Sequence, residues 1–379
     1  MLARSFYLDP SLDFFYSTFL TVVAILSVPV VVVLFTVILT QTPKYMRPLR
    51  LYLLNISFWH FLDSFVVAIV WRPVNLYPLP CMGFNGALRF LGVYFARFLF
   101  HVRSVAITNV YVAIIACFIY RWAQLRGKTN FLMVRCKRSA KRRSELPRNV
   151  TLIAPGTVIR LLFQLLSSRR GFAIVLGVHL VFVLYQSLLM VTFYVDNSRT
   201  LNPLPKSPSL LALVAEEEGL MCYSMQNIFS PIFIYAGIAV AIAFTVSVCV
   251  LIVLIQLPFW GDLRSKVAVK TLEMHRTLTL SLVLFAVIHI LFKAIPVIVG
   301  VYLSLGSDFY ANLVGLLCIA AEAVEPLLSG LATLILIVPY RRALRNLFSY
   351  IVGLYKKNIL YLGWTQKSSS AVRRIHSIT

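Results

Sequence analysis

Residues 15–39 read FYSTFLTVVAILSVPVVVVLFTVIL, a run of 25 positions without a single charged side chain. An α-helix rises 1.5 Å per residue, so a helix of this length spans the roughly 30 Å hydrocarbon core of a bilayer. The whole chain of 379 residues is 60% hydrophobic and 13% charged, whereas a typical soluble domain has about 25% charged residues. The run therefore predicts a helix that crosses a membrane.

Six further apolar runs of similar length follow along the chain. They are 51–71, 88–120, 171–195, 232–257, 278–303 and 313–338. Backbone groups in hydrocarbon find no water, so each run must satisfy its hydrogen bonds internally as a helix. The runs also lack the alternation of barrel strands, which are about ten residues long. Together they predict an all-α membrane protein, a seven-transmembrane helical bundle.

The distribution of Lys and Arg indicates how this bundle is inserted. The segments 40–50, 121–170, 258–277 and 339–379 hold 28 of the 36 Lys and Arg residues, whereas the N-terminal segment and the alternate connections hold three. Basic connections remain in the cytoplasm. We therefore expect the N-terminus outside and the C-terminus in the cytoplasm. The sequon at Asn149 then lies inside and remains unmodified.

The net charge of +23 also suggests nucleic-acid binding. The basic residues fall between apolar runs on alternating sides, as membrane insertion requires, so we expect no nucleic-acid partner. The cluster from Arg135 to Arg143 in the longest cytoplasmic connection favours anionic lipids of the inner leaflet, with an acidic protein partner as the alternative. The cysteines show no CxxC pair, and we expect neither a metal site nor a cofactor.

The segment after the seventh run has a pattern of its own. Leu344, Leu347, Phe348 and Ile351 recur at helical spacing among basic residues, which predicts an amphipathic helix on the inner leaflet. We divide the chain into a seven-helix domain, residues 1–345, and a basic cytoplasmic tail, residues 346–379.

Several short motifs occur in a fixed order along the chain. They are Thr42-Pro43-Lys44-Tyr45-Met46, then Leu54-Asn55-Ile56-Ser57-Phe58-Trp59 followed by Asp63, then Tyr77-Pro78-Leu79-Pro80-Cys81, Met221-Cys222, Lys270-Thr271-Leu272 and Pro339-Tyr340-Arg341. In order and spacing they resemble the nematode serpentine chemoreceptors, most closely class H of the Str-type superfamily of G-protein-coupled receptors. The chain differs from that pattern at Ser57, where the family usually has His.

The resemblance implies a chemosensory receptor in the cell membrane, with a sensory cilium as the implied location. An external small molecule would bind among the outer halves of the helices, and a heterotrimeric G protein would bind on the cytoplasmic side. The residues implied on that side are Tyr120, Arg121, Pro339, Tyr340 and Arg341. An arginine that extends to the inner interface is the alternative role for Arg121. No hydrolase triad or phosphate loop indicates an enzyme.

Two cysteines, Cys81 and Cys222, fall in predicted outer connections. A disulfide between them would hold the second outer connection over the mouth of the bundle. Two free thiols are the alternative, which is uncommon outside the cell.

Ionisable side chains occur within the apolar runs, where each costs at least about 2.5–3.5 kcal/mol. They are Asp63, Arg97, His101, Arg103, Lys293, Glu322 and Glu325. The helical rise puts Arg97, Lys293, Glu322 and Glu325 at one depth, with His101 on the face of Arg97. We expect a ligand pocket or a switch there, with a static ion pair as the alternative. Asp63 and Arg103 are expected to form a deeper, inner polar contact.

Charges inside a membrane are also found in transporters and channels. A membrane transporter or a ligand-gated channel is therefore the alternative function. The odd number of spans and the lack of an internal repeat favour a receptor. An inverted seven-span odorant channel would need its N-terminus inside, which the distribution of Lys and Arg opposes.

Overall fold

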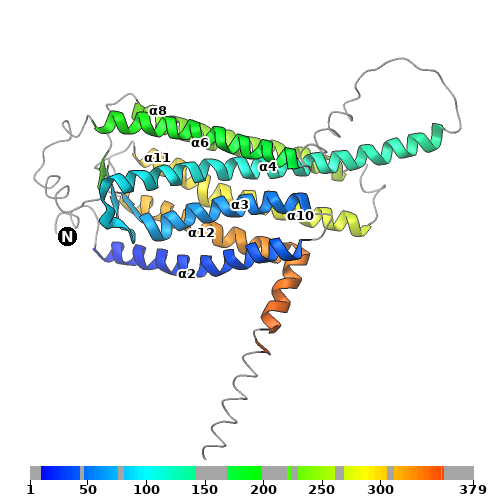
Figure 1. Ribbon diagram of the computed structural model, residues 1–379, viewed down its shortest axis with the longest axis horizontal. Coiled ribbons are helices and arrows are strands. Elements are labelled where there is room, and N and C mark those ends of the chain that lie inside the picture. Colours follow the sequence, from blue (N-terminus) through cyan, green and yellow to red (C-terminus); the bar gives the residue numbers. More distant parts are fainter. Residues whose placement is uncertain are drawn as a thin grey trace, which may run out of the picture.

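The computed structural model describes residues 10–42, 47–75, 81–141, 169–198, 220–222, 229–260, 269–304, 311–350 and 352–353. Its long helices lie side by side in one bundle (Figure 1). Seven of them are long and apolar enough to span: Pro10–Gln41, Leu49–Trp71, Arg89–Gln124, Gly171–Val191, Tyr235–Ile255, Arg276–Gly300 and Asn312–Leu336. The predicted seven-transmembrane bundle is confirmed.

The elements follow one another with few interruptions. The first spans are α2 (Pro10–Gln41), α3 (Arg47–Phe65) continued by η2 (Val66–Trp71), and α4 (Gly92–Lys141) preceded by η3 (Arg89–Leu91). Then come α6 (Arg169–Ser198), α8 (Phe229–Trp260), α10 (Val269–His289) with η4 (Ile290–Ala294) and α11 (Ile295–Ser304), and α12 (Ala311–Leu336). Helix α4 continues well beyond the predicted end of its span at Tyr120, because its basic continuation remains helical.

Two spans contain a wide, π-helical turn. In η2 the backbone N–H of Arg72 donates to Val67 O, and in η4 that of Ile295 donates to Ile290 O, both five residues back. Pro296 follows η4 and lacks the N–H that an α-helix would offer to Phe292. Such turns occur often at functional sites. Both interrupt the spans close to the ionisable side chains described below.

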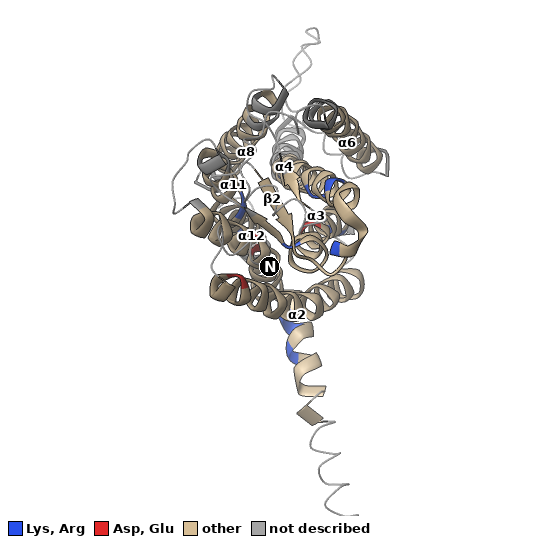
Figure 2. Ribbon diagram, turned by 90° about the vertical axis from the view of Figure 1, so that its left-hand side faces the viewer, with Lys and Arg blue, Asp and Glu red and all other residues tan. Residues whose placement is uncertain are grey.

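A small sheet lies across the outer end of the bundle (Figure 2). Strands β1 (Pro73–Asn75), β2 (Cys81–Phe84) and β3 (Met221–Cys222) pair antiparallel in the order β1-β2-β3. Cys81 is disulfide-bonded and buried, and the register places Cys222 opposite it. We call these three strands the outer sheet.

The outer sheet is anchored to the first two spans. Arg72 ends η2 with a left-handed φ of 49°, a conformation that costs a non-glycine residue roughly 1–2 kcal/mol. Its guanidinium donates to Ser17 Oγ at 3.1 Å and Thr21 Oγ1 at 2.9 Å on α2. Tyr16 donates its hydroxyl hydrogen to Pro73 O at 2.8 Å. These bonds hold the turn that leads the chain from η2 into β1.

Close packing continues behind the sheet at Gly86. A Cβ atom there would lie 1.8 Å from Val70 O, so only glycine fits. The largest buried cluster occupies the other half of the bundle and includes Tyr52, Tyr120 and Tyr340. Many large apolar side chains on α2, α6 and α8 are exposed, as expected for faces that meet lipid.

The chain remains helical beyond α12. After a bend at Ile337, residues 338–350 form a further helix that leaves the bundle at an angle (Figure 1). Leu347 and Phe348 on it are exposed, as are Arg341 and Arg345. This is the helix expected after the seventh span. Asn149 and most of the tail lie outside the described residues.

Candidate functional site: a buried ring of charges

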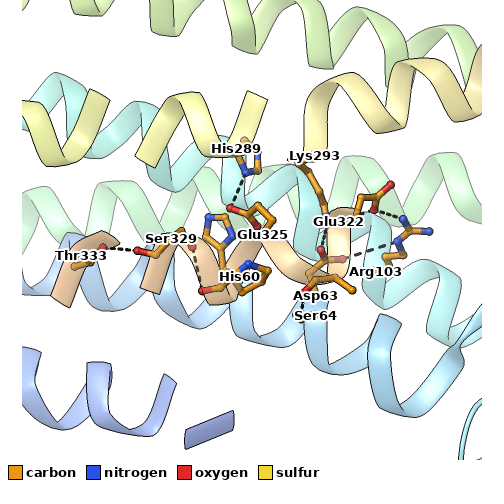
Figure 3. Close-up of polar contacts among 12 residues, drawn as sticks. His60, Asp63, Ser64, Arg103, His289, Lys293, Glu322, Glu325, Ser329 and Thr333 are labelled. Atoms are coloured by element: carbon orange, nitrogen blue, oxygen red, sulfur yellow. Dashed lines mark hydrogen bonds and ion pairs between the residues drawn. The ribbon is translucent and has the colours of Figure 1, made fainter. Parts of the chain in front are cut away.

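Four ionic side chains from four helical segments form a closed ring (Figure 3). Arg103 Nη2 on α4 donates to Glu322 Oε2 on α12, and Lys293 Nζ on η4 donates to Asp63 Oδ2 on α3. Lys293 Nζ also lies 3.4 Å from Glu322 Oε2, and Arg103 Nε lies 3.9 Å from Asp63 Oδ1. Each cation therefore contacts both carboxylates. We call these four residues the charge ring.

The charge ring is almost dry. The exposed fractions are 1% for Lys293, 2% for Asp63, 4% for Glu322 and 8% for Arg103. An isolated ionised group is very costly in such surroundings, and buried charges are accordingly paired. Two cations and two carboxylates sum to zero here. The ring therefore holds four helical segments together only while all four members are present.

Arg103 connects the charge ring to the outer end of the bundle. Its guanidinium carbon lies 5.5 Å from the centroid of the Trp71 ring. Trp71 is the last residue of η2 and is 1% exposed, and the chain turns from there into the outer sheet. The ring thus lies beneath the sheet, with one buried aromatic side chain between them.

A second polar group lies one turn further along α12. Glu325 is three residues after Glu322 and shares its helix face. Its Oε2 lies 2.5 Å from His60 Nδ1 on α3, and its Oε1 lies 3.5 Å from His289 Nδ1 on α10. The two imidazole rings meet edge to face at 5.3 Å. We call His60, His289 and Glu325 the histidine group.

The grouping differs from the one expected from depth along the spans. Asp63 and Arg103 were expected in a deeper contact, but the structure unites them with Lys293 and Glu322. Counting residues from the span ends ignores helix tilt and the wide turns η2 and η4. Lys293 does contact Glu322, as expected for neighbouring helices, but its second carboxylate is Asp63. Glu325 contacts the two histidines instead.

Arg97 and His101 lie apart from the charge ring. The Arg97 guanidinium carbon lies 5.8 Å from the centroid of the Tyr94 ring, and His101 Nε2 lies 3.2 Å from Ser187 Oγ on α6. Arg97 precedes Arg103 by six residues, and successive residues are rotated by about 100° around an α-helix. The two arginines therefore project from different faces of α4, which is why a shared depth does not bring Arg97 into the ring.

A third polar cluster joins α3, α4 and α6. His179 lies 2.8 Å from Asn55 Nδ2 through its Nε2 and contacts Asn109 Oδ1 through its Nδ1. Trp59 donates to Asn55 Oδ1 at 3.1 Å and stacks on the His179 ring at 5.6 Å. Every member finds a partner within the cluster, which indicates a structural link between the three helices.

At the predicted cytoplasmic end, Tyr120 and Arg121 are buried. Tyr120 stacks on Tyr52 with ring centroids 4.9 Å apart. Arg121 has an exposed fraction of 0% and donates to Gln124 Oε1 at 2.5 Å. An arginine that extends to the interface would be exposed. Arg121 instead lies in the core.

The segment after the seventh span closes the same end. Tyr340 is 0% exposed, and its hydroxyl lies 2.8 Å from Thr42 Oγ1 at the end of the first span. Burial raises the pKa of the Tyr340 hydroxyl, although the contact with Thr42 opposes that rise. Pro339 is partly buried and Arg341 is exposed. Tyr340 therefore connects the two ends of the chain's helical order.

Two polar residues of these clusters escaped sequence reasoning, and each carried a signal. His60 lies three residues before Asp63 and therefore on the same face of its helix. His179 is the only ionisable residue between Gly171 and Tyr185 except for that tyrosine. Both are neutral in the simple charge count, which is why attention to Lys, Arg, Asp and Glu passed over them.

Comparison with known proteins supports the architecture. The model of one family, described as serpentine type 7TM GPCR chemoreceptor Srh, matches residues 11–163 and 159–350. A search of the curated proteins finds no match. The family match covers all seven spans and both polar groups. The chain therefore belongs to the serpentine type 7TM GPCR chemoreceptor Srh family.

Proposed function

We propose that this chain is a chemosensory receptor that binds an external small molecule among the outer halves of its helices and signals to a heterotrimeric G protein. The chain is a multi-pass membrane protein of a chemoreceptor family. Its place would be the cell membrane, in a sensory cilium, with the N-terminus outside. The observation that carries the proposal is the charge ring, because it joins four helical segments through contacts that a ligand can compete for.

The ring makes a suitable switch because its members are interdependent. Removing one partner of a buried ion pair costs roughly 3–5 kcal/mol, since the other charge is left unpaired. A ligand with an acidic or basic group can replace one member and pair with its former partner. Such a ligand would favour a state in which Lys293 or Arg103 has moved, and so would shift the population of helix arrangements.

Signal output is assigned to the opposite end of the bundle. Tyr120, Arg121 and Tyr340 are buried there in the largest apolar cluster or beside it, so a G protein would reach them only after the helices separate. Pro339 and Arg341 lie at the start of the last helix. The exposed Arg341, Arg342 and Arg345 are placed to contact anionic lipids of the inner leaflet.

The test is a ligand screen in cells that carry a G-protein activation reporter. The panel contains small organic acids, amines and neutral compounds. For any compound that activates the receptor, Glu322→Gln should shift the dose response by at least tenfold. Arg89→Gln is the matched control, since Arg89 is exposed at the outer end, and it should respond like the unaltered chain. Equal responses from Glu322→Gln and the control would contradict a role of the ring in signalling.

A transporter or a ligand-gated channel remains the second candidate, because the charge ring lies in the interior of the bundle. That function predicts ligand-dependent current or uptake in cells whose G proteins are inactivated. A receptor predicts that the response disappears in those cells. An N-terminal epitope tag adds an independent check, since an inverted channel would hide the tag on intact cells.

A further inference from the structure

We propose that the histidine group, His60, His289 and Glu325, is a binding site for a divalent transition metal of the zinc class. The three residues come from α3, α10 and α12 and lie beside the charge ring (Figure 3). The charge ring is complete without them, and the proposed signalling function makes no use of them.

The donor atoms already lie near the spacing of a metal site. One ligand atom from each residue can be chosen so that all three lie within 4.8 Å of one another. Zn–N and Zn–O bonds of about 2.0–2.2 Å in a tetrahedron place neighbouring donors roughly 3.3–3.6 Å apart. His289 Nδ1 and Glu325 Oε1 are 3.5 Å apart, and His60 Nδ1 and Glu325 Oε2 are 2.5 Å apart. Small side-chain rotations therefore suffice to admit the ion.

Several of these atoms are buried without a hydrogen-bond partner among the described residues. They are His60 Nε2, both ring nitrogens of His289, and Glu325 Oε1. His289 and Glu325 have exposed fractions of 0%, and His60 of 3%. Buried polar atoms are rarely left unsatisfied in folded proteins. A metal ion would satisfy His289 Nδ1 and Glu325 Oε1 together.

The type of donor selects the type of metal. Imidazole nitrogen suits Zn²⁺, Cu²⁺ and Ni²⁺, whereas Mg²⁺ and Ca²⁺ prefer sites made of oxygen ligands. The single carboxylate supplies one negative charge against the two positive charges of the ion. Metal binding displaces the proton shared across the short contact between His60 and Glu325, and that proton leaves to solvent.

Aromatic rings hold the histidines in place. His60 packs against Phe285 with ring centroids 5.0 Å apart, and His289 packs against Tyr111 at 5.1 Å and Phe244 at 5.3 Å. The Tyr111 hydroxyl is itself buried without a hydrogen-bond partner in the described part of the chain. It could donate to a water molecule or anion in the fourth coordination position, which the three protein ligands leave open.

The first measurement uses the purified full chain in detergent micelles with Co²⁺ as a spectroscopic probe for Zn²⁺. A tetrahedral site with nitrogen and oxygen donors should give an intense visible absorption band at one equivalent of Co²⁺, and Zn²⁺ should abolish it. Mg²⁺ in excess should have no effect. A folded chain that shows no such band overturns the proposal, and this result needs no variant.

The second measurement compares variants by competition with a chromophoric chelator. His60→Ala and His289→Ala should weaken Zn²⁺ binding by at least the roughly 10–100-fold seen when an outer-shell partner of a metal is lost. His101→Ala is the matched control, a histidine of the same bundle that contacts Ser187 instead, and it should bind Zn²⁺ as tightly as the unaltered chain. Equal affinity in all three variants, or equal loss in all three, contradicts the site. Neither measurement involves an odorant or a G protein, so it can fail while the proposed receptor function stands.

Discussion

Lys293 Nζ lies 3.4 Å from Glu322 Oε2, across the interface between the sixth and seventh spans. The same ammonium group also contacts Asp63 of the second span. Lys293 therefore shares its charge between two carboxylates that belong to different helices, and its loss would leave both with a single cation, Arg103. This relationship makes Lys293 the member of the charge ring whose removal is most informative.

Lys293→Leu should destabilise the folded chain by roughly 3–5 kcal/mol, because it leaves a carboxylate unpaired in a dry interior. Adding Glu322→Gln or Asp63→Asn in the same chain should restore part of that loss. Thermal unfolding of the detergent-solubilised protein measures both effects. Glu325→Gln is the control, since Glu325 contacts histidines instead, and it should restore nothing. Equal rescue by all three neutral variants would show that charge pairing at this position is not specific.

Cys81→Ser and Cys222→Ser should each lower surface expression by about as much as the double variant, because the second substitution removes nothing once the bridge is gone. This follows if the disulfide of Cys81 is made to Cys222, its register partner in the outer sheet. Flow cytometry of an extracellular tag gives the measurement. Losses that add would mean that the two cysteines act independently.

Gly86→Ala should destabilise the outer sheet by about 1–3 kcal/mol or more, the usual cost of overpacking, since its Cβ would meet Val70 O at 1.8 Å. Gly177→Ala provides a matched control within α6, where an added Cβ meets nothing within 4 Å. That change should leave the unfolding temperature unchanged or raise it. The prediction fails if Gly86→Ala is as well tolerated as Gly177→Ala.

The expected orientation can be checked without any ligand. An N-terminal tag should be accessible to antibody on intact cells, and enzymatic deglycosylation should leave the electrophoretic mobility of the chain unchanged. The reason is that Asn149 lies on the basic, cytoplasmic side of the predicted topology. A mobility shift that disappears in Asn149→Gln would reverse the orientation.

The seven spans could be predicted from the sequence because a bilayer requires long apolar helices and little else supplies them. The partners of the buried charges could not. Depth along a span follows from counting residues, but the direction in which a side chain points depends on how each helix is rotated and tilted. Arg97 and Arg103 illustrate this, since one lies beside Tyr94 and the other in the charge ring. A single sequence contains no measure of that rotation.

The histidines show a second limit of the same kind. His60 and His289 lie on different helices and become neighbours only when α3 and α10 pack on opposite sides of Glu325. Neither has a motif of metal-ligand spacing along the chain. The expectation of no metal site rested on cysteine spacing, and that criterion does not detect ligands contributed by separate spans.

The wide turn η4 has a consequence for the helix that follows it. A π-type turn contains one residue more than an α-type turn, and one residue corresponds to about 100° of rotation around a helix axis. Returning η4 to α-type bonding would therefore turn α11 about its own axis by that angle relative to α10, with few backbone hydrogen bonds exchanged. Lys293 lies inside the turn and would leave Asp63, while His289 at the end of α10 would stay beside Glu325. The sixth span thus contains a built-in swivel, positioned so that rotation uncouples the charges and leaves the histidines in place.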